Sequence, residues 1–229
     1  TIFNNKNHLI NLYGDEVEVD YRDREVTVEN LIRVLIGRHE EGVVDSKKLQ
    51  TNKESNILVY MTGHGGDEFI KFQDAQEISS FDLADAFEQM HQANRYNEIL
   101  FVVDTCQASS LYTRFYSPGI VAVGSSALGE NSYSHHTDPH IGVAVIDRFT
   151  YFMLEYLEKN VNADSQHSLL SMFRHVKRQR LHSTLQWRDD LVGPKNPTQR
   201  DFSQMLISDF FASVHSLRKT TGNNIIENG

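Results

Sequence analysis

The sequence has little cysteine, little positive charge and no long apolar run. Its 229 residues contain one cysteine, which excludes an internal disulfide but fits reducing and oxidising compartments alike. Lysine and arginine number 22 against 31 acidic residues, and the formal net charge of −9 argues against nucleic acid as a main partner. No apolar run approaches the ~20 residues of a membrane-spanning helix, and no Asn-x-Ser/Thr glycan acceptor occurs. The length and composition favour a folded globular domain with a substantial core.

Two apolar runs end in residues that carry chemistry. The run at 57–60 leads to His64, which stands between two glycines, and the run at 99–103 leads to Cys106. The separation of 42 residues from His64 to Cys106 suffices for a strand, a helix and a return strand, so the two runs are predicted to be neighbouring parallel strands that open at one sheet edge. A thiolate is a strong nucleophile and an imidazole is a suitable proton acceptor. We therefore predict Cys106 as nucleophile, His64 as its base, and the backbone N–H groups of Gly65 and Cys106 as an oxyanion hole.

The rest of the chain alternates between strand and helix patterns. Residues 28–36 carry an apolar stripe at helical spacing behind Thr27, a predicted N-cap, and Ser80 is predicted to cap a second helix. Further strands are expected at 17–19, 120–124 and 205–207, further helices at 108–115, 142–159 and 166–181, a hairpin near 68–73, a polar loop at 125–140 and irregular chain at 184–203. This alternation predicts an α/β fold, with three layers in the order α/β/α and a mostly parallel central sheet.

Several segments resemble the caspase-fold cysteine peptidases of the legumain-like group. The strand–His–Gly and strand–Asp-x-Cys pair matches the signature of that clan. A wider set is similar to the branch of the family that attaches glycosylphosphatidylinositol (GPI) lipids: VEVDYR at 17–22, YMTGHGG at 60–66, KFQD at 71–74, RYNE at 95–98, VDTCQ at 103–107, FYSP at 115–118 and ISDFF at 207–211. The resemblance runs from about residue 3 to 214. It implies a caspase-like catalytic domain at 1–218, followed by a polar tail at 219–229.

The resemblance also implies a reaction, its partners and its setting. Cys106 would attack a peptide bond near the C-terminus of a precursor protein, and His64 would protonate the departing C-terminal signal. The ethanolamine amine of a GPI lipid would then open the thioester. The implied partners are the precursor's signal, the GPI lipid and other subunits of a membrane complex on the lumenal face of the endoplasmic reticulum, with no cofactor required for the chemistry.

Two alternative functions, and the question of assembly, stay open at this point. The first is a legumain- or metacaspase-like endopeptidase, in which water opens the same thioester. The second is a caspase-like scaffold without catalysis. A homodimer of the isolated domain, paired through a sheet edge, is also conceivable. The residues alone do not decide between an amine and water as acceptor.

The family pattern includes parts that this sequence does not contain. Upstream of Thr1 the family carries a strand and a helix, with an Asn that assists the histidine and a Cys that tethers a partner subunit, and it ends in a membrane span. We therefore expect the chain to be a processed, truncated or partly ordered piece that corresponds to the soluble lumenal part.

One set of residues is a candidate for substrate binding. Gln107, Ser125, Ser126 and Ser132 occupy the stretches where legumain-like enzymes recognise the residue before the scissile bond. The alternative is that the serines cap a solvated loop, because serine favours loops in any case.

An acidic segment near the start is a candidate metal site. Glu18 and Asp20 would share one face of a strand, and with Val19 they match a family segment that contributes to a calcium site. The alternative is a solvated strand face, or pairing with Arg22 or Arg24.

Overall fold

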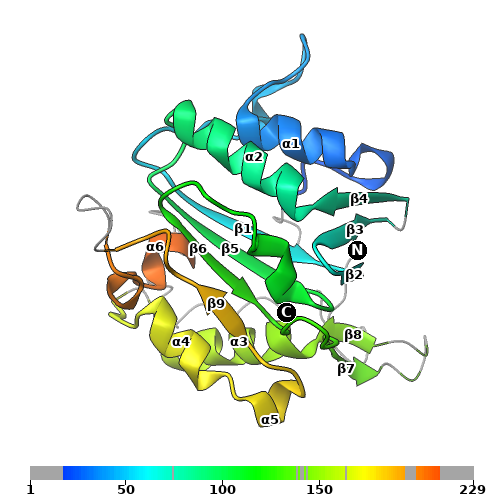
Figure 1. Ribbon diagram of the computed structural model, residues 1–229, viewed down its shortest axis with the longest axis vertical. Helices are drawn as coiled ribbons and strands as arrows, with labels where there is room; N and C mark the ends of the chain where they lie inside the picture. Colours follow the sequence, from blue (N-terminus) through cyan, green and yellow to red (C-terminus); the bar gives the residue numbers. More distant parts are fainter. Residues whose placement is uncertain are drawn as a thin grey trace, which may run out of the picture.

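Among the described residues four strands form the central sheet, and helices cover both of its faces (Figure 1). The structure is a computed structural model, and it describes residues 18–73, 75–137, 139, 142, 144–162, 164–193 and 200–211. In sheet order the strands are β1 (Asn56–Thr62), β5 (Glu98–Asp104), β6 (Ile120–Gly124) and β9 (Gln186–Arg188). β1, β5 and β6 are parallel, whereas β9 runs antiparallel to β6. The predicted α/β fold with a mostly parallel sheet is confirmed.

Strand β5 shows why the sheet needs a layer on each side. All seven of its residues are buried. Helices α1 (Val28–Ile36) and α2 (Ser80–Gln92) cover one face, and α3 (Arg148–Asn160) and α4 (Leu169–His175) cover the other (Figure 1). Because side chains alternate along a strand, Ile99, Phe101 and Val103 pack in the α1–α2 cluster, while Leu100 and Val102 pack in the α3–α4 cluster. The continuous apolar run in the sequence follows from burial on both faces.

Capping residues determine where the helices of the first face begin and end. The Thr27 side chain accepts a hydrogen bond from the first turn of α1, and Gly37, with φ of 73°, ends that helix in the left-handed conformation. In α2 the cap is Ser79, which forms a capping box with Asp82. The prediction of Ser80 as the cap was wrong by one residue, because Ser80 is a fully buried residue of the first turn.

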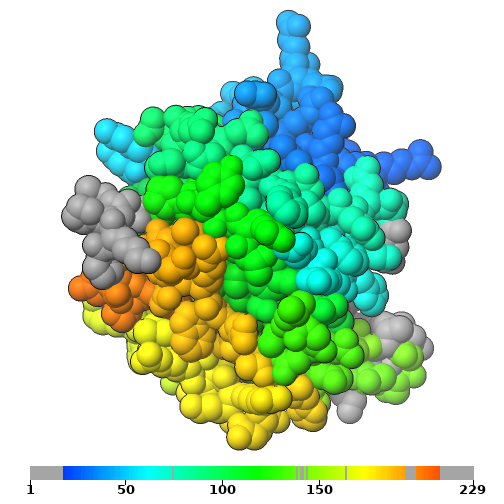
Figure 2. Space-filling view, in the orientation of Figure 1, coloured from blue at the N-terminus to red at the C-terminus, as the bar shows by residue number. Residues whose placement is uncertain are grey.

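The remaining elements are short. They are β2 (Gly65–Gly66), β3 (Phe69–Phe72) and β4 (Gln76–Ser79) in one antiparallel sheet, the hairpin of β7 (Ser134–Thr137) and β8 (Ala144–Asp147), helices α5 (Arg178–Leu181) and α6 (Ser208–Phe211), and the 3-10 helices η1 (Asp23–Glu25), η2 (Asp45–Lys47), η3 (Ala108–Tyr112) and η4 (Phe202–Gln204). Strand β9 contacts η3, and the Tyr112 hydroxyl donates to the Gln186 carbonyl over 3.1 Å. In the space-filling view the gold surface around β9 borders the green surface of the chain that includes η3 (Figure 2). Among the described residues no helix is long and apolar enough to cross a membrane.

The largest departure from the predicted elements lies between β6 and α3. Residues 125–140 were expected to be a loop and 142–159 a helix. Instead, β7 and β8 pair as an antiparallel hairpin, and the helix begins only at Arg148. Val145 and Ile146 are β-branched and fit a strand as well as an amphipathic helix, so the sequence pattern there is ambiguous.

Four smaller expectations also differ from the structure. Residues 18–20 form no strand, and 205–207 contribute only a single bridge, between Ser168 and Leu206. The helix expected at 166–181 divides into α4 and α5, because Val176 adopts an extended conformation that buries its side chain. The segment at 184–203, expected to be irregular, supplies edge strand β9. The predicted tail at 219–229 lies outside the described residues.

Candidate active site

His64 and Cys106 reach one cavity from neighbouring parallel strands. The last residue pair in the β1–β5 register is Thr62 with Asp104. His64 lies two residues after Thr62, and Cys106 lies two residues after Asp104. The cavity has a volume of about 280 Å³ and is lined by Gly63, His64, Asp104, Thr105, Cys106, Ser132, Ser134 and Asp147. Cys106 is partly exposed. In the part of the chain that the structure describes, no hydrogen bond joins the two side chains, as is common before a substrate binds.

The turn that carries His64 is held by its neighbours against residues 105–107, which include the predicted nucleophile Cys106 and are called here the nucleophile segment. The Gly63 N–H donates to the Asp104 carbonyl over 3.3 Å, and the Thr105 hydroxyl donates to the Gly63 carbonyl over 2.7 Å. A Cβ at Gly65 would lie 2.5 Å from Thr105 Oγ1, closer than such atoms approach. Only glycine therefore allows this contact between the two segments.

Strand pairing orients the backbone of Gly65. The Lys71 N–H donates to the His64 carbonyl over 2.8 Å, so His64 and Lys71 are a hydrogen-bonded pair of the antiparallel ladder. Such pairs alternate with pairs that exchange no bonds, so the Gly65 N–H, opposite Ile70, points away from β3. This N–H is therefore not used in the β2–β3 ladder, as an oxyanion donor requires; its oxyanion role stays a prediction.

Asp104, directly before the nucleophile segment, is a buried carboxylate that accepts three hydrogen bonds. Its Oδ1 accepts from the Ser132 hydroxyl over 2.7 Å. Its Oδ2 accepts from the Thr150 hydroxyl over 2.8 Å and from the Thr150 N–H over 3.2 Å. The Thr150 N–H belongs to the first turn of α3, where the helix dipole favours negative charge.

Asp147 is a second carboxylate in the cavity, and the sequence patterns did not identify it. It accepts a hydrogen bond from the Thr62 hydroxyl over 2.8 Å. Burial raises its pKa, and the charge of Asp104 raises it further, against the opposing effects of the Thr62 hydrogen bond and of His64. The residue fell inside a predicted helix, so no signal marked it as a site residue.

Of the four predicted substrate residues, one lines the cavity and three form hydrogen bonds that support the chain around Cys106. Ser132 lines the cavity. Ser125 and Ser126 are fully buried, and both hydroxyls donate to the Thr105 carbonyl, that of Ser126 over 2.7 Å. Gln107 has φ of 55°, and its side chain accepts from the Gly129 N–H over 3.1 Å. These contacts support the nucleophile segment; whether any of the four residues touches substrate stays a prediction.

Glu130 is a further supporting residue that sequence reasoning missed. Its carbonyl accepts from the Gln107 N–H over 2.8 Å, and its carboxylate accepts from the Thr184 N–H over 2.6 Å. The Thr184 hydrogen bond lowers the pKa of this carboxyl, so it holds the loop as an anion. Glu130 thereby links Gln107, the residue after Cys106, to Thr184, which lies just before β9.

The predicted calcium residues do not form a site on their own. Glu18, Val19 and Asp20 lie in chain without regular structure, and Val19 is exposed. Within the described ranges no three His, Cys, Asp or Glu side chains gather so as to hold a metal. Three ligands are fewer than calcium needs, so a calcium site here requires further ligands from other residues. The calcium site stays a prediction that these residues do not test.

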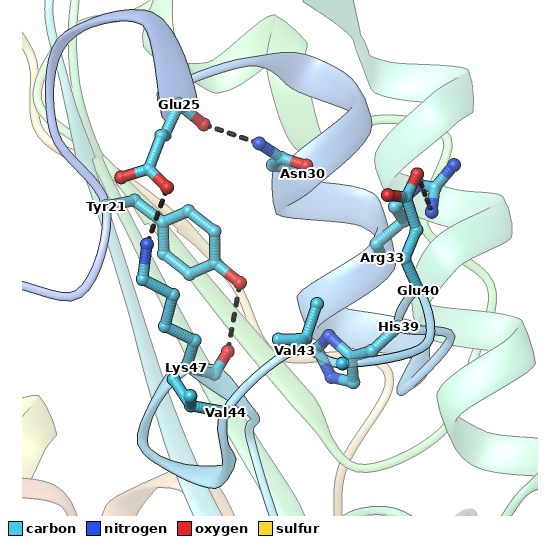
Figure 3. Close-up of a pocket in the computed structure, with 10 residues that line it drawn as sticks. Tyr21, Glu25, Asn30, Arg33, His39, Glu40, Val43, Val44 and Lys47 are labelled. Atoms are coloured by element: carbon cyan, nitrogen blue, oxygen red, sulfur yellow. Dashed lines mark hydrogen bonds and ion pairs between the residues drawn. The ribbon is translucent and has the colours of Figure 1, made fainter.

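A second cavity, of about 480 Å³, lies between α1 and the chain at 39–47 (Figure 3). Its charges are paired with one another: Lys47 with Glu25 at 2.5 Å, and Arg33 with Glu40 at 3.0 Å. The Tyr21 hydroxyl donates to the Lys47 carbonyl over 3.0 Å. The lining residues include no cysteine or serine nucleophile, so this cavity offers no counterpart to the Cys106 site.

Comparison with known proteins places these features in context. The model of the peptidase C13 family matches residues 1–204. A Saccharomyces cerevisiae protein named GPI-anchor transamidase is 55% identical over 217 residues, which cover 95% of this chain and 51% of that protein. Proteins of the same name from Schizosaccharomyces pombe and Homo sapiens are 54% and 52% identical, over 95% and 96% of this chain and 56% and 54% of their own lengths. The chain thus spans about half the length of these relatives.

Proposed function

The chain belongs to the peptidase C13 family, and we propose that it is the catalytic domain of a GPI transamidase that works through a Cys106–His64 pair. The observation that carries the proposal is the cavity that His64 and Cys106 share at the carboxyl ends of two parallel strands. Identity of 50–55% to proteins named GPI-anchor transamidase, one of them named as putative, supports the choice of reaction.

The first half of the reaction forms a thioester. His64 takes the proton of the Cys106 thiol, and the thiolate attacks the carbonyl carbon of the peptide bond at the attachment site. The negative charge on the carbonyl oxygen is stabilised by the N–H groups of Gly65 and Cys106. When the C–N bond breaks, His64 returns its proton to the departing amine of the C-terminal signal.

The second half transfers the acyl group to an amine. The ethanolamine nitrogen of a GPI lipid attacks the thioester carbon, and His64 accepts the proton that this nitrogen loses. The C–S bond then breaks, an amide forms, and the Cys106 thiolate is restored. Water in place of the amine would give the endopeptidase outcome from the same intermediate.

The cavity also favours small polar groups at the attachment residue. Asp104, Asp147 and Ser132 supply oxygen atoms around a space of about 280 Å³ beside the nucleophile. We assign this space to the side chain before the scissile bond. The partners and setting follow from the proposal: the precursor signal, the GPI lipid and further subunits of a complex at the lumenal face of the endoplasmic reticulum membrane.

Hydrazine capture in the assembled full-length complex tests the proposal. We expect a precursor incubated with hydrazine to give a C-terminal hydrazide, measured by mass spectrometry, and Cys106→Ala to abolish it. Formation of free acid without hydrazide would support the endopeptidase instead. Full cellular function of both Cys106→Ala and His64→Ala would support a non-catalytic scaffold.

A further inference from the structure

Thr105 stands between the buried carboxylate Asp104 and the nucleophile Cys106, and its own role is unassigned. It is only 2% exposed, so its side chain does not serve the surface. It lines the cavity but carries no group that the reaction requires. Its contacts therefore show what it does.

The Thr105 side chain contacts both glycines that flank His64. Its hydroxyl donates to the Gly63 carbonyl over 2.7 Å. Its Oγ1 and Cγ2 lie 2.5 Å and 3.2 Å from where a Cβ of Gly65 would stand, so the side chain packs against that backbone. His64 is thus held on its N-terminal side by a hydrogen bond and on its C-terminal side by close packing.

The Thr105 main chain is held from the opposite direction. Its carbonyl accepts from the Ser126 hydroxyl over 2.7 Å and, at 3.4 Å, from the Ser125 hydroxyl. Both serines are fully buried at the end of β6. The residue that holds the His64 turn is therefore itself fixed to the core of the sheet.

We propose that Thr105 is a positioning residue that sets the His64–Gly65 turn in register with Cys106, and that its hydroxyl group is what does so. The inference rests on the proposed function for the roles of His64 and Cys106. One side chain then determines two alignments at once, that of the imidazole with the thiol and that of the Gly65 N–H with the oxyanion.

Two substitutions separate the hydroxyl from the methyl of this side chain. In Thr105→Val a methyl replaces Oγ1, and a carbon atom cannot lie 2.7 Å from the Gly63 oxygen, since such contacts settle at about 3.3–3.6 Å. The turn must move by several tenths of an ångström. Thr105→Ser keeps the donor and loses only the methyl, so the turn stays in place.

The first readout is hydrazide formation by the full-length complex that carries each variant. We expect Thr105→Val to lower kcat about 10- to 100-fold with KM within about twofold, because the alignment of reacting groups changes while precursor binding does not. Thr105→Ser is expected to stay within about threefold of the parent. Thr113→Val is the control, since it removes a hydroxyl that bonds the Ser110 carbonyl (2.8 Å) and the Glu68 carboxylate (3.2 Å) outside the cavity, and it is expected to change neither constant.

The second readout needs no acceptor amine. Iodoacetamide alkylates the Cys106 thiolate with loss of iodide, and the rate is measured by mass spectrometry of the peptide that contains Cys106. We expect Thr105→Val and His64→Ala each to slow alkylation severalfold, and the double variant to be no slower than His64→Ala alone. Such non-additivity is the signature of action through His64, which general destabilisation does not produce.

Several results would overturn the inference. They are additive effects in the alkylation cycle, a kcat in Thr105→Ser as low as in Thr105→Val, or a loss confined to KM. If Thr105→Val does not assemble, the comparison of Thr105→Ser with Thr105→Ala replaces it, and equal activity of those two would refute the role. If the parent complex forms no hydrazide, the proposed function fails, but the alkylation cycle still decides the role of Thr105.

Discussion

The two ends of strand β5 each carry one buried carboxylate, and the protein holds them in different ways. At the amino end Glu98, 2% exposed, accepts two hydrogen bonds from Arg200, at 2.5 Å and 3.2 Å. Arg200 also donates to Asp209 over 2.7 Å. The carboxylate at this end is therefore paired with a cation that links the sheet to the chain beyond β9.

At the carboxyl end the partners of the carboxylate are neutral. Asp104, 1% exposed, accepts hydrogen bonds from Ser132 and Thr150, and among the described residues no lysine or arginine pairs with it. Its negative charge instead acts on Asp147, whose pKa is raised mainly by burial and further by Asp104. The comparison teaches that the carboxylate at the amino end is paired with a cation, whereas the carboxylate beside His64 and Cys106 is held by neutral donors.

Removal of Cys106, the proposed nucleophile, is expected to have the largest effect and tests whether the carboxyl end of β5 carries the catalytic groups. Cys106→Ala should lower hydrazide formation by at least about 10³-fold, because no thioester can form. Thermal unfolding of the full-length chain should change little, since Cys106 is partly exposed. A variant with substantial activity would contradict the assignment of the two ends.

Loss of the cation at the amino end of β5 is expected to lower the stability of the fold without changing the rate of the reaction. Arg200→Ala leaves Glu98 buried and unpaired, and the free energy of unfolding should fall by about 2–4 kcal/mol, in the range for a broken buried pair whose cation is partly exposed. Urea denaturation measures the change, and kcat per folded molecule should stay within about twofold.

The matched control for Arg200→Ala is Lys159→Ala, which breaks an exposed pair with Glu155 and should cost at most about 1 kcal/mol. Equal costs for the two variants would show that Glu98 does not depend on its cation.

Removal of a neutral donor at the carboxyl end is expected to have an intermediate effect. Thr150→Val deletes the hydroxyl that donates to Asp104 and that also bonds the Tyr60 hydroxyl. Stability should fall by about 1–3 kcal/mol, the cost of leaving a buried polar group short of a partner. Thr150→Ser should restore most of it. Full stability of Thr150→Val would mean that Asp104 does not need this donor.

The smallest expected effect concerns Asp147 and its pH dependence. Because its pKa is raised in the folded chain, the folded state holds this proton more tightly than the unfolded state. Stability should therefore fall as pH rises from the ordinary Asp range through the raised pKa. Asp147→Asn should remove that part of the pH dependence and be more stable than the parent at neutral pH. Urea denaturation across pH measures the difference in the free energy of unfolding between Asp147→Asn and the parent, and this difference should shrink in acid. A difference that grows in acid would refute the raised pKa of Asp147.

Some of the site could be predicted because its signals are local. The runs before His64 and Cys106 are continuous and apolar, which is what strands buried on both faces require. Thr27 caps α1 as expected, since a cap acts within one turn. The placement of His64 and Cys106 in one cavity followed from the length of chain between them.

Other parts could not be predicted, because they depend on contacts distant in sequence. Asp147 reaches the cavity only because β8 pairs with β7, and its partner Thr62 lies 85 residues away. Ser125 and Ser126 were expected to line a substrate pocket or face water, but they lie buried under the Thr105 carbonyl. No local pattern distinguishes a serine that supports a loop from one that lines a pocket.

The sequence by itself determined the alternation of strands and helices and the two residues most suited to nucleophile and base, because hydrophobic periodicity and side-chain chemistry are local properties. Only the tertiary structure decided which groups surround them. The contact of Thr105 with the glycines beside His64, the two carboxylates of the cavity and the pairing of Glu98 with Arg200 all arise where separate segments meet. Burial and distance, which set the strength of those interactions, exist only once the chain has folded.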